Sequence, residues 1–296
     1  MHYRSKLFWL YIAITVAYVT TFLMPRTISN LPSLPDGQQR LVGLAVVIPL
    51  AIIWFLAFYG SATLHSYAKK IHDSEDGKQV AFLATGLLIV ALGLPIGSMG
   101  TAIGNIVSTH NQEAAIVIRI VRNYVSMLFP LVGFLFINHA AYGLSRIARH
   151  RPRYRDSQML IAVYVIVSTA YCYAALSSPN IETIYHLPPW LLMLTLVAPY
   201  LFTWYTGLLA AYEVRLYAKN VAGKLYRQSW NILSLGLAAI VTAQILLQYS
   251  VTFTVRIQSL QMVRLFVTIY VLLAAMSVGY VLVAAGAKRL KKIEEV

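Results

Sequence analysis

Eight long stretches of the chain are apolar and almost free of charge, and this feature constrains the fold more than any other. A bilayer core of about 30 Å is crossed by about 20 helical residues. In the chain of 296 residues, the stretches that reach this length are 7–24, 41–68, 80–108, 120–146, 158–178, 188–216, 229–252 and 263–287. In lipid, such segments satisfy their backbone polar groups by forming helices. The sequence therefore predicts an all-α polytopic membrane protein with eight transmembrane helices.

The composition agrees with a membrane protein and excludes a soluble globular enzyme. Charged residues make up 11% of the chain and hydrophobic residues 59%, whereas a soluble domain has about 25% charged residues. In a protein of this class, the net charge of +14 indicates loop topology and anionic lipid headgroups rather than nucleic acid. The single cysteine, Cys172, excludes disulfides and cysteine-ligated metals within the chain.

The basic residues are distributed unequally between the two sets of loops. Eighteen of the 24 Lys and Arg residues fall in the two termini and the loops 69–79, 146–157 and 215–228, and six fall in the opposite set. By the positive-inside rule, the richer set is cytoplasmic. We therefore expect a multi-pass protein of the cytoplasmic (inner) membrane with both termini in the cytoplasm, where the basic loops face anionic headgroups.

The chain repeats part of its own sequence. Residues 41–70 align without a gap with residues 191–220, at an offset of 150, and the identities are Leu41/Leu191, Leu44/Leu194, Val47/Val197, Pro49/Pro199, Trp54/Trp204, Tyr67/Tyr217, Ala68/Ala218 and Lys69/Lys219. Four helices per repeat is an even number, so both copies are expected to enter the membrane in the same direction, related by a pseudo-two-fold axis along the membrane normal. This predicts a first four-helix repeat over 1–148, a basic cytoplasmic linker over 149–157 and a second repeat over 158–296.

Shorter matches continue the repeat with a decreasing offset of 146, 143 and 142. They are Gly77-Lys78 with Gly223-Lys224, Leu92-Gly93-Leu94 with Leu235-Gly236-Leu237, and Val121-Arg122 with Val263-Arg264. Parallel repeats of this kind occur in transporters, which favours transport by analogy of architecture. The alternative is a duplication that enlarged a structural bundle.

Polar side chains recur at matching places in the outer part of the predicted bundle. Two pairs at i, i+4 share a helix face, and two arginines begin helices at a comparable depth. A buried amide costs several kcal/mol unless it is hydrogen-bonded, so these groups are expected to face each other or a wet cavity. One interpretation is an outward vestibule that binds a polar or anionic solute; the other is interhelical hydrogen bonding with arginines at headgroup level. The expected substrate-binding residues are Thr101, Asn105, Arg122, Gln244, Gln248 and Arg264.

Prolines and glycines give expectations about helix shape and packing. Pro49 and Pro199 lie at equivalent places inside two predicted helices, where each removes a backbone hydrogen bond, so they are candidate hinges or structural kinks. Small residues at three- and four-residue spacing predict close helix packing on one face, or a route lined by small side chains. These glycines are Gly93, Gly97, Gly100 and Gly104.

One acidic residue and two histidines lie within the predicted apolar stretches. Glu213 is near the cytoplasmic end of its predicted helix, and we expect it to be interfacial and solvated rather than ion-coupling. His65 and His139 lie on different helices at similar depth, which is the minimal pair for a b-type haem. A separate hydrogen-bonded role for each histidine is the favoured interpretation.

The preferred functional interpretation is a small-solute transporter or channel, with a cavity between the two repeats. No covalent chemistry is expected, and neither catalytic residues, a metal site nor a cofactor is predicted, because no P-loop, His-Glu-x-x-His or Cys/His motif is present in the sequence. The alternative is a non-catalytic scaffold or sensor that docks partners or anionic lipid through its basic cytoplasmic face. A haem-binding electron carrier is the third possibility.

Overall fold

The computed structural model is helical throughout the long segments that it describes. The described residues are 8–9, 11–17, 20, 36–71, 74–108, 110–148, 162, 166, 198–220, 223–254 and 260–293. The helices of this part are α2 (Asp36–Lys70), α3 (Glu75–Ser108), α4 (Gln112–Ile147), α7 (Ala198–Asn220), α8 (Lys224–Thr254) and α9 (Leu260–Ile293). Most of the fifth expected span, parts of the first and sixth, and the linker 149–157 lie outside the described residues.

Five segments of these helices are long and apolar enough to cross a membrane. They are Ile48–Lys70, Glu75–Gly97, Leu128–Ile147, Lys224–Leu247 and Tyr270–Ile293. This is the pattern of a multi-pass membrane protein. The helix α7 is not among the five, and it carries Glu213, Arg215 and several aromatic residues. The remaining expected spans, like the orientation in the membrane, stay predictions.

Local sequence signals explain where several helices begin. Asn111 precedes α4, and its side-chain oxygen accepts a hydrogen bond from the backbone N–H of Ala114 at 3.0 Å, as expected of an N-cap. Before α3, the Ser74 Oγ accepts from the N–H of Gly77 at 3.1 Å. Gly223 separates α7 from α8 with a φ of 94°, a conformation that favours glycine.

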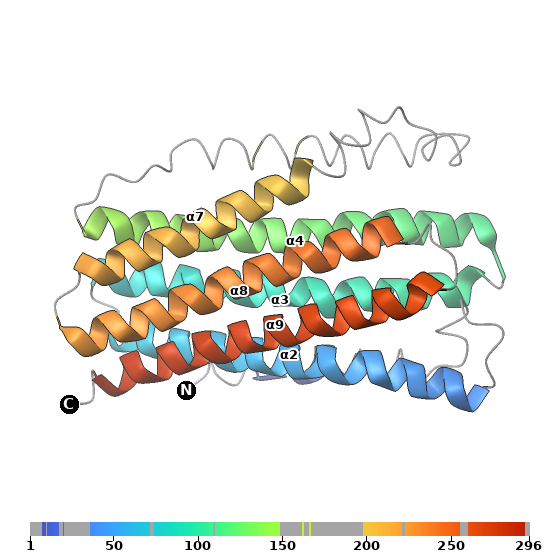
Figure 1. Ribbon diagram of the computed structural model, residues 1–296, viewed down its shortest axis with the longest axis horizontal. Coiled ribbons are helices and arrows are strands. Elements are labelled where there is room, and N and C mark those ends of the chain that lie inside the picture. Colours follow the sequence, from blue (N-terminus) through green and yellow to red (C-terminus); the bar gives the residue numbers. More distant parts are fainter. Residues whose placement is uncertain are drawn as a thin grey trace.

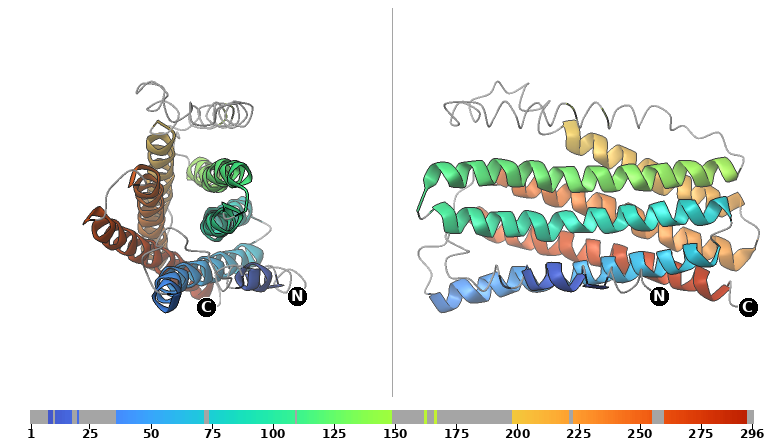
Figure 2. Two further views of the ribbon diagram at one scale, coloured as in Figure 1. Left: turned by 90° about the vertical axis from the view of Figure 1, so that its right-hand side faces the viewer. Right: turned by 180° about the vertical axis from the view of Figure 1, so that it is seen from behind.

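The six described helices form a closed ring (Figure 1). Each contacts the next in the order α2, α3, α4, α7, α8, α9, and α9 returns to α2. In the end view of Figure 2, the pair α3–α4 faces the pair α8–α9, and α2 and α7 lie at opposite edges between the two pairs. Contacts that join α2 to α9 and α4 to α7 therefore connect the two halves of the chain.

One end of the ring is strongly basic. At this end, on the left of Figure 1, α2, α4, α7 and α9 finish and α3 and α8 begin. We call it the basic end, and the opposite end the far end. The described basic residues in the helix ends and turns here are Lys69, Lys70, Lys78, Arg146, Arg215, Lys219, Lys224, Arg227, Lys288, Arg289, Lys291 and Lys292.

Glycines bring the backbones of neighbouring helices into contact. A Cβ added to Gly86 of α3 would lie 2.6 Å from the carbonyl oxygen of Gly133 on α4, and one added to Gly133 would lie 2.7 Å from that of Gly86. Gly236 of α8 and Gly279 of α9 are related in the same way, at 2.6 and 2.9 Å. Direct contact between the backbones of two helices at glycine residues is typical of helices packed in lipid.

The expected glycine face and hinges are only partly described. Gly93 packs against α4, because an added Cβ would lie 3.1 Å from the ring of Pro130, which confirms the packing interpretation at this residue. Pro49 lies inside α2, as expected, and Pro95 and Pro130 lie inside α3 and α4. Pro199 is the second residue of α7 as described, and its side chain lies outside the described part. Whether Pro49 and Pro199 act as hinges stays a prediction.

Candidate functional site

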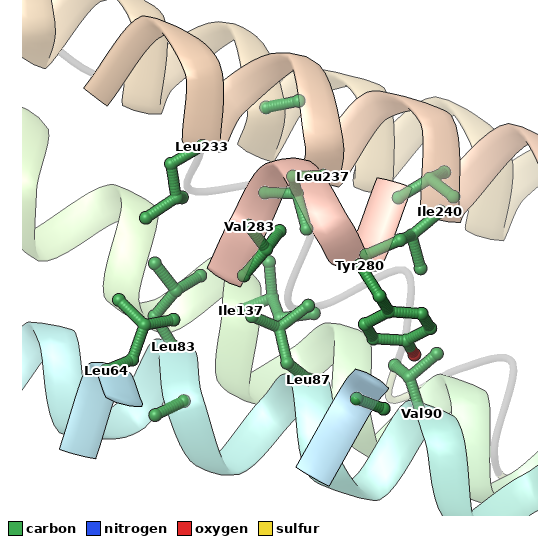
Figure 3. Close-up of a cluster of buried hydrophobic side chains, with 14 of the residues drawn as sticks. Leu64, Leu83, Leu87, Val90, Ile137, Leu233, Leu237, Ile240, Tyr280 and Val283 are labelled. Carbon is green, nitrogen blue, oxygen red and sulfur yellow. The ribbon is translucent and has the colours of Figure 1, made fainter. Parts of the chain in front are cut away.

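The interior of the ring is filled by apolar side chains toward the basic end. Figure 3 shows these side chains pointing toward one another from α2, α3, α4, α8 and α9. Each is at most 1% exposed. They form an apolar layer inside the ring, although Ser61, Asn138 and Ser234 are buried on the same helix turns. An apolar constriction disfavours water and ions. We call this set the apolar plug; its members are Leu64, Leu83, Leu87, Val90, Ile137, Leu233, Leu237, Ile240 and Val283.

Buried polar atoms follow the plug on its far-end side. Tyr280 lies beside Val90 and Ile240 in Figure 3, and its hydroxyl is buried with no hydrogen-bond partner among the described residues. Gln244 is one helical turn beyond Ile240 on α8, is 2% exposed, and its Oε1 also lacks a partner in the described part of the chain. Buried polar atoms are nearly always paired with protein or with water, so this level of the bundle is suited to hold water or a polar ligand.

Two hydrogen bonds cross the ring at the basic end. The hydroxyl of Tyr217 on α7 donates to Oδ2 of Asp76 on α3 at 3.2 Å, and the hydroxyl of Tyr67 on α2 is hydrogen-bonded to that of Tyr226 on α8. Each bond joins helices that are separated in the ring by one other helix. We call these four residues the tyrosine latch. The Tyr217 ring also packs edge-on against the buried Trp230, with ring centres 5.0 Å apart.

The latch was not anticipated as a site from the sequence, although a signal for it was present. Tyr67 and Tyr217 are the tyrosines of the repeated Tyr-Ala-Lys triplets. Their partners Asp76 and Tyr226 are also 150 residues apart in the sequence. If the repeat offset of 150 is kept through the turn that follows each triplet, Asp76 aligns with Tyr226, just as Tyr67 aligns with Tyr217.

Glu213 is not solvated, and the expectation that it lies in the interface with water is wrong. Its side chain is 1% exposed. The Ser145 hydroxyl of α4 donates to its Oε2 at 2.6 Å, while its Oε1 is buried without a hydrogen-bond partner in the described residues. The expectation failed because α4 packs over this face of α7, a contact that sequence position near a helix end does not reveal.

Of the expected substrate-binding residues, Gln244 is the one whose side chain is described. It is buried in the bundle, one helical turn beyond Ile240 of the plug toward the far end of α8. The other five have helical backbones in α3, α4, α8 and α9, and their side chains lie outside the described part. These five are Thr101, Asn105, Arg122, Gln248 and Arg264.

Each of the two candidate haem histidines has a contact of its own with α3. His65 Nε2 is 3.3 Å from Oγ1 of Thr85. The exposed His139 packs edge-on against Phe82, with ring centres 4.9 Å apart. These contacts agree with separate structural roles. Among the described residues, no group of three or more His, Cys, Asp or Glu side chains is placed to hold a metal ion.

Comparisons with known proteins give no assignment. No protein-family model matches the sequence, and no curated protein and no solved structure matches it significantly. The class defined by the structure is therefore a helical, multi-pass membrane protein, and its function is argued from the interior of the ring.

Proposed function

We propose that this protein is a small-solute transporter or channel of the cytoplasmic membrane. Its pathway follows the interior of the helix ring, and the apolar plug and the tyrosine latch close it at the basic end. The observation that carries this proposal is that Tyr280 Oη and Gln244 Oε1 are buried on the far-end side of the apolar plug and lack a hydrogen-bond partner among the described residues. A bundle that served only as a scaffold would gain stability by pairing or removing such groups.

The proposal includes two repeats related by a pseudo-two-fold axis along the ring. The glycine contacts support it, because Gly86–Gly133 and Gly236–Gly279 have the same reciprocal geometry. Their neighbours correspond as well: Gly133 approaches the backbone N–H of Val90, and Gly279 approaches that of Ile240, at 2.7 and 3.0 Å from the added Cβ. The offset is then 150 between α3 and α8, and 146 between α4 and α9.

This offset changes one expectation about the polar residues. With an offset of 143, the counterpart of Thr101 in the second half is Gln244. With an offset of 150, the counterpart of Gln244 is Leu94, and the counterpart of Thr101 lies two helical turns further along α8. The proposed cavity is therefore not lined by matching amides at one depth. Gln244 lies near the plug, and Thr101 and Asn105 belong to a level closer to the far end.

The latch also supports two-fold related halves. In an interface between equivalent units, a contact from residue i to residue j is accompanied by the contact from j to i. Tyr67 of the first half contacts Tyr226 of the second, and Tyr217 of the second half contacts Asp76 of the first. With the offset of 150, these are the same contact made in both directions.

An anionic or polar solute is the proposed cargo. Arg122 and Arg264 are placed by the sequence near the far end of α4 and α9, where two fixed positive charges beside a low-dielectric wall would concentrate anions. Because the basic loops are expected to be cytoplasmic, the far end is the external one, and the pathway opens away from the cytoplasm.

Cysteine accessibility at Gln244 tests the proposal. In a Cys172→Ala background, Gln244→Cys should react with a membrane-impermeant, charged methanethiosulfonate, because the cavity contains water. Leu237→Cys, within the plug on the same helix, is the matched control and should stay unreactive. Lack of reaction at both positions would contradict a water-filled pathway. Gln244→Leu gives a second measurement: it should leave thermal stability unchanged or higher, since no hydrogen bond to a described residue is lost.

A non-catalytic scaffold or sensor is the second candidate. It is favoured by the concentration of exposed basic side chains at one end, among them Lys219, Lys288 and Arg289, which suits anionic lipid or an acidic partner. Unreactive Gln244→Cys together with strong binding to vesicles of anionic lipid would support this candidate over transport.

A further inference from the structure

Glu213 is a buried carboxyl group that the proposed pathway does not use. It lies on α7, in the seam that α7 forms with α4, and it is 1% exposed. Ser145 contributes the one hydrogen bond described for it, to Oε2 at 2.6 Å, and Oε1 remains buried and unpartnered within the described part of the chain. A carboxylate in this state would be a buried charge with half of its hydrogen-bonding capacity unused.

The charged and titratable side chains of α4 do not neutralise Glu213. Arg146 is exposed, and its guanidinium lies over the ring of Tyr142, 6.0 Å from the ring centre. His139 is exposed and packs against Phe82 of α3. No ion pair with Glu213 is formed by these described residues, although α4 is the helix that covers it.

The same holds for α8 and for α7 itself. The exposed Arg227 of α8 donates to the carbonyl oxygen of Lys219 at 3.1 Å. Tyr226 is bonded to Tyr67, and Lys224 is exposed at the start of α8. On α7, Arg215 is exposed, while Tyr217 is engaged by Asp76. The described surroundings of Glu213 therefore offer a hydroxyl group and no cation.

We propose that Glu213 is a proton-binding site, occupied by a proton when the α4–α7 seam is closed. Burying an unpaired carboxylate in a membrane protein costs several kcal/mol or more, and such residues mark ion and proton pathways. A proton removes this charge without further ligands. A hard metal ion needs about six oxygen ligands, whereas Ser145 is the one described side chain within hydrogen-bonding distance.

The position of Glu213 allows its proton to exchange with water at the basic end. Glu213 is seven residues before the end of α7 and Ser145 two residues before the end of α4, so the group lies about 10 Å from the helix terminus. Separation of α4 from α7 would expose it, and the charged form is favoured only when exposed. Because this seam joins the two halves of the ring, loss of the proton favours opening at the basic end. This step rests on the proposed transport function.

The proton site belongs to one half of the molecule only. With the offsets of 150 and 146, the counterparts of Glu213 and Ser145 are Thr63 and Lys291. The Thr63 hydroxyl donates to the carbonyl oxygen of Tyr59 in its own helix at 2.8 Å. One proton per molecule is therefore expected, bound at the α4–α7 seam and not at the α2–α9 seam.

Labelling with dicyclohexylcarbodiimide tests the proposal, because this apolar reagent modifies neutral carboxyl groups in apolar surroundings. Purified full-length protein in lipid nanodiscs should be labelled at Glu213, as mapped by mass spectrometry. Labelling should fall when the pH is raised, because the reagent reacts with the neutral carboxyl group and not with the carboxylate. The exposed Glu75 of the same molecule is the internal control and should stay unlabelled. Labelling of Glu213 that does not change with pH, or protection by Na⁺ at constant pH, would overturn the proposal.

A second measurement does not depend on the reagent. After an alkaline pH jump, the wild type should release one more proton per molecule than Glu213→Gln, a variant that keeps the side-chain shape and the bond to Ser145. Equal proton release would overturn the proton site. A reactive Gln244→Cys combined with equal proton release would leave the pathway intact and remove only the proton site. An unreactive Gln244→Cys combined with one extra proton would remove the pathway and support the proton site.

Discussion

The hydroxyl of Tyr217 lies 3.2 Å from Oδ2 of Asp76, which is 141 residues earlier in the chain. This bond joins the last turn of α7 to the first turn of α3 across the basic end of the ring. The other carboxylate oxygen of Asp76 is buried and has no partner among the described residues. Tyr217 is therefore the one described side chain that satisfies the Asp76 carboxyl group.

The Tyr217–Asp76 bond should contribute measurably to stability. In a double-mutant cycle with Tyr217→Phe and Asp76→Ala, we expect a coupling energy of about 1–2 kcal/mol, since a hydrogen bond to a partly buried carboxyl is lost. Thermal or denaturant unfolding in detergent provides the measurement. The exposed Tyr212, on the same helix, serves as the control, and its Phe variant should show no coupling to Asp76→Ala. Equal coupling in both cycles would contradict a specific latch.

Substitution at the glycine contacts should destabilise the helix pairs. In Gly86→Ala the new methyl group would lie 2.6 Å from the Gly133 carbonyl oxygen, and backbone atoms cannot rotate away. We expect a loss of about 1–3 kcal/mol, as is typical of overpacking. Gly60→Ala is the matched control, because its nearest contact would be an ordinary 3.6 Å and its effect should stay within about 0.5 kcal/mol. Similar losses in both variants would show that helix propensity alone is being measured.

A polar residue in the apolar plug should make the membrane leaky. Leu237→Ser places a hydroxyl in the centre of the plug, which favours hydration of the constriction. We expect iodide flux into proteoliposomes to rise several-fold over the wild type. Leu235→Ser on the same helix is the control, because Leu235 is 58% exposed and points away from the core. Unchanged iodide flux in Leu237→Ser would contradict a pathway through the ring interior.

The far-end arginines should determine anion preference. Arg122→Gln combined with Arg264→Gln should reduce anion flux with little effect on folding, whereas the double Lys variant should retain more of it unless bidentate recognition matters. The effect should weaken at high ionic strength, since the screening length is about 10 Å at 0.1 M salt. A scaffold would show no change in solute flux with either pair of substitutions.

The orientation in the membrane can be tested with single cysteines in a Cys172→Ala background. Cysteines at Ser74 and Asn220 should be protected from impermeant reagents applied outside the cell, and those at Ser33 and Asn111 should react. The expectation follows from the excess of Lys and Arg in the loops at the basic end. The reverse labelling pattern would invert the topology and place the latch at the external face.

The helices were predictable, because long apolar stretches in lipid have few alternatives to helix formation. The burial of individual side chains was harder to predict. Glu213 is two residues before Arg215 near a helix end, a pattern that suggests solvation, yet α4 covers it. Such burial depends on which helix packs against which, and the α4–α7 contact joins segments far apart in the sequence.

The interior site could be predicted only in part. Gln244 was singled out as a costly polar group in an apolar helix, and the burial of its Oε1 without a partner among the described residues agrees with that reasoning. The plug was not distinguishable from other leucines, because Leu237 faces the core and Leu235 faces outward on one uniformly apolar helix. The latch required the register of α3 against α8, and gaps in the repeat alignment obscured it.

The glycine contacts also restrict how the molecule can deform. Where backbone touches backbone, as at Gly86 and Gly133, there is no side chain to change rotamer and absorb a displacement. The α3–α4 and α8–α9 hairpins should therefore behave as two stiff levers. Deformation is then expected at the other seams of the ring, α2–α3, α2–α9, α4–α7 and α7–α8. A single buried carboxyl group at one of them, the α4–α7 seam, is enough to make the two levers respond unequally.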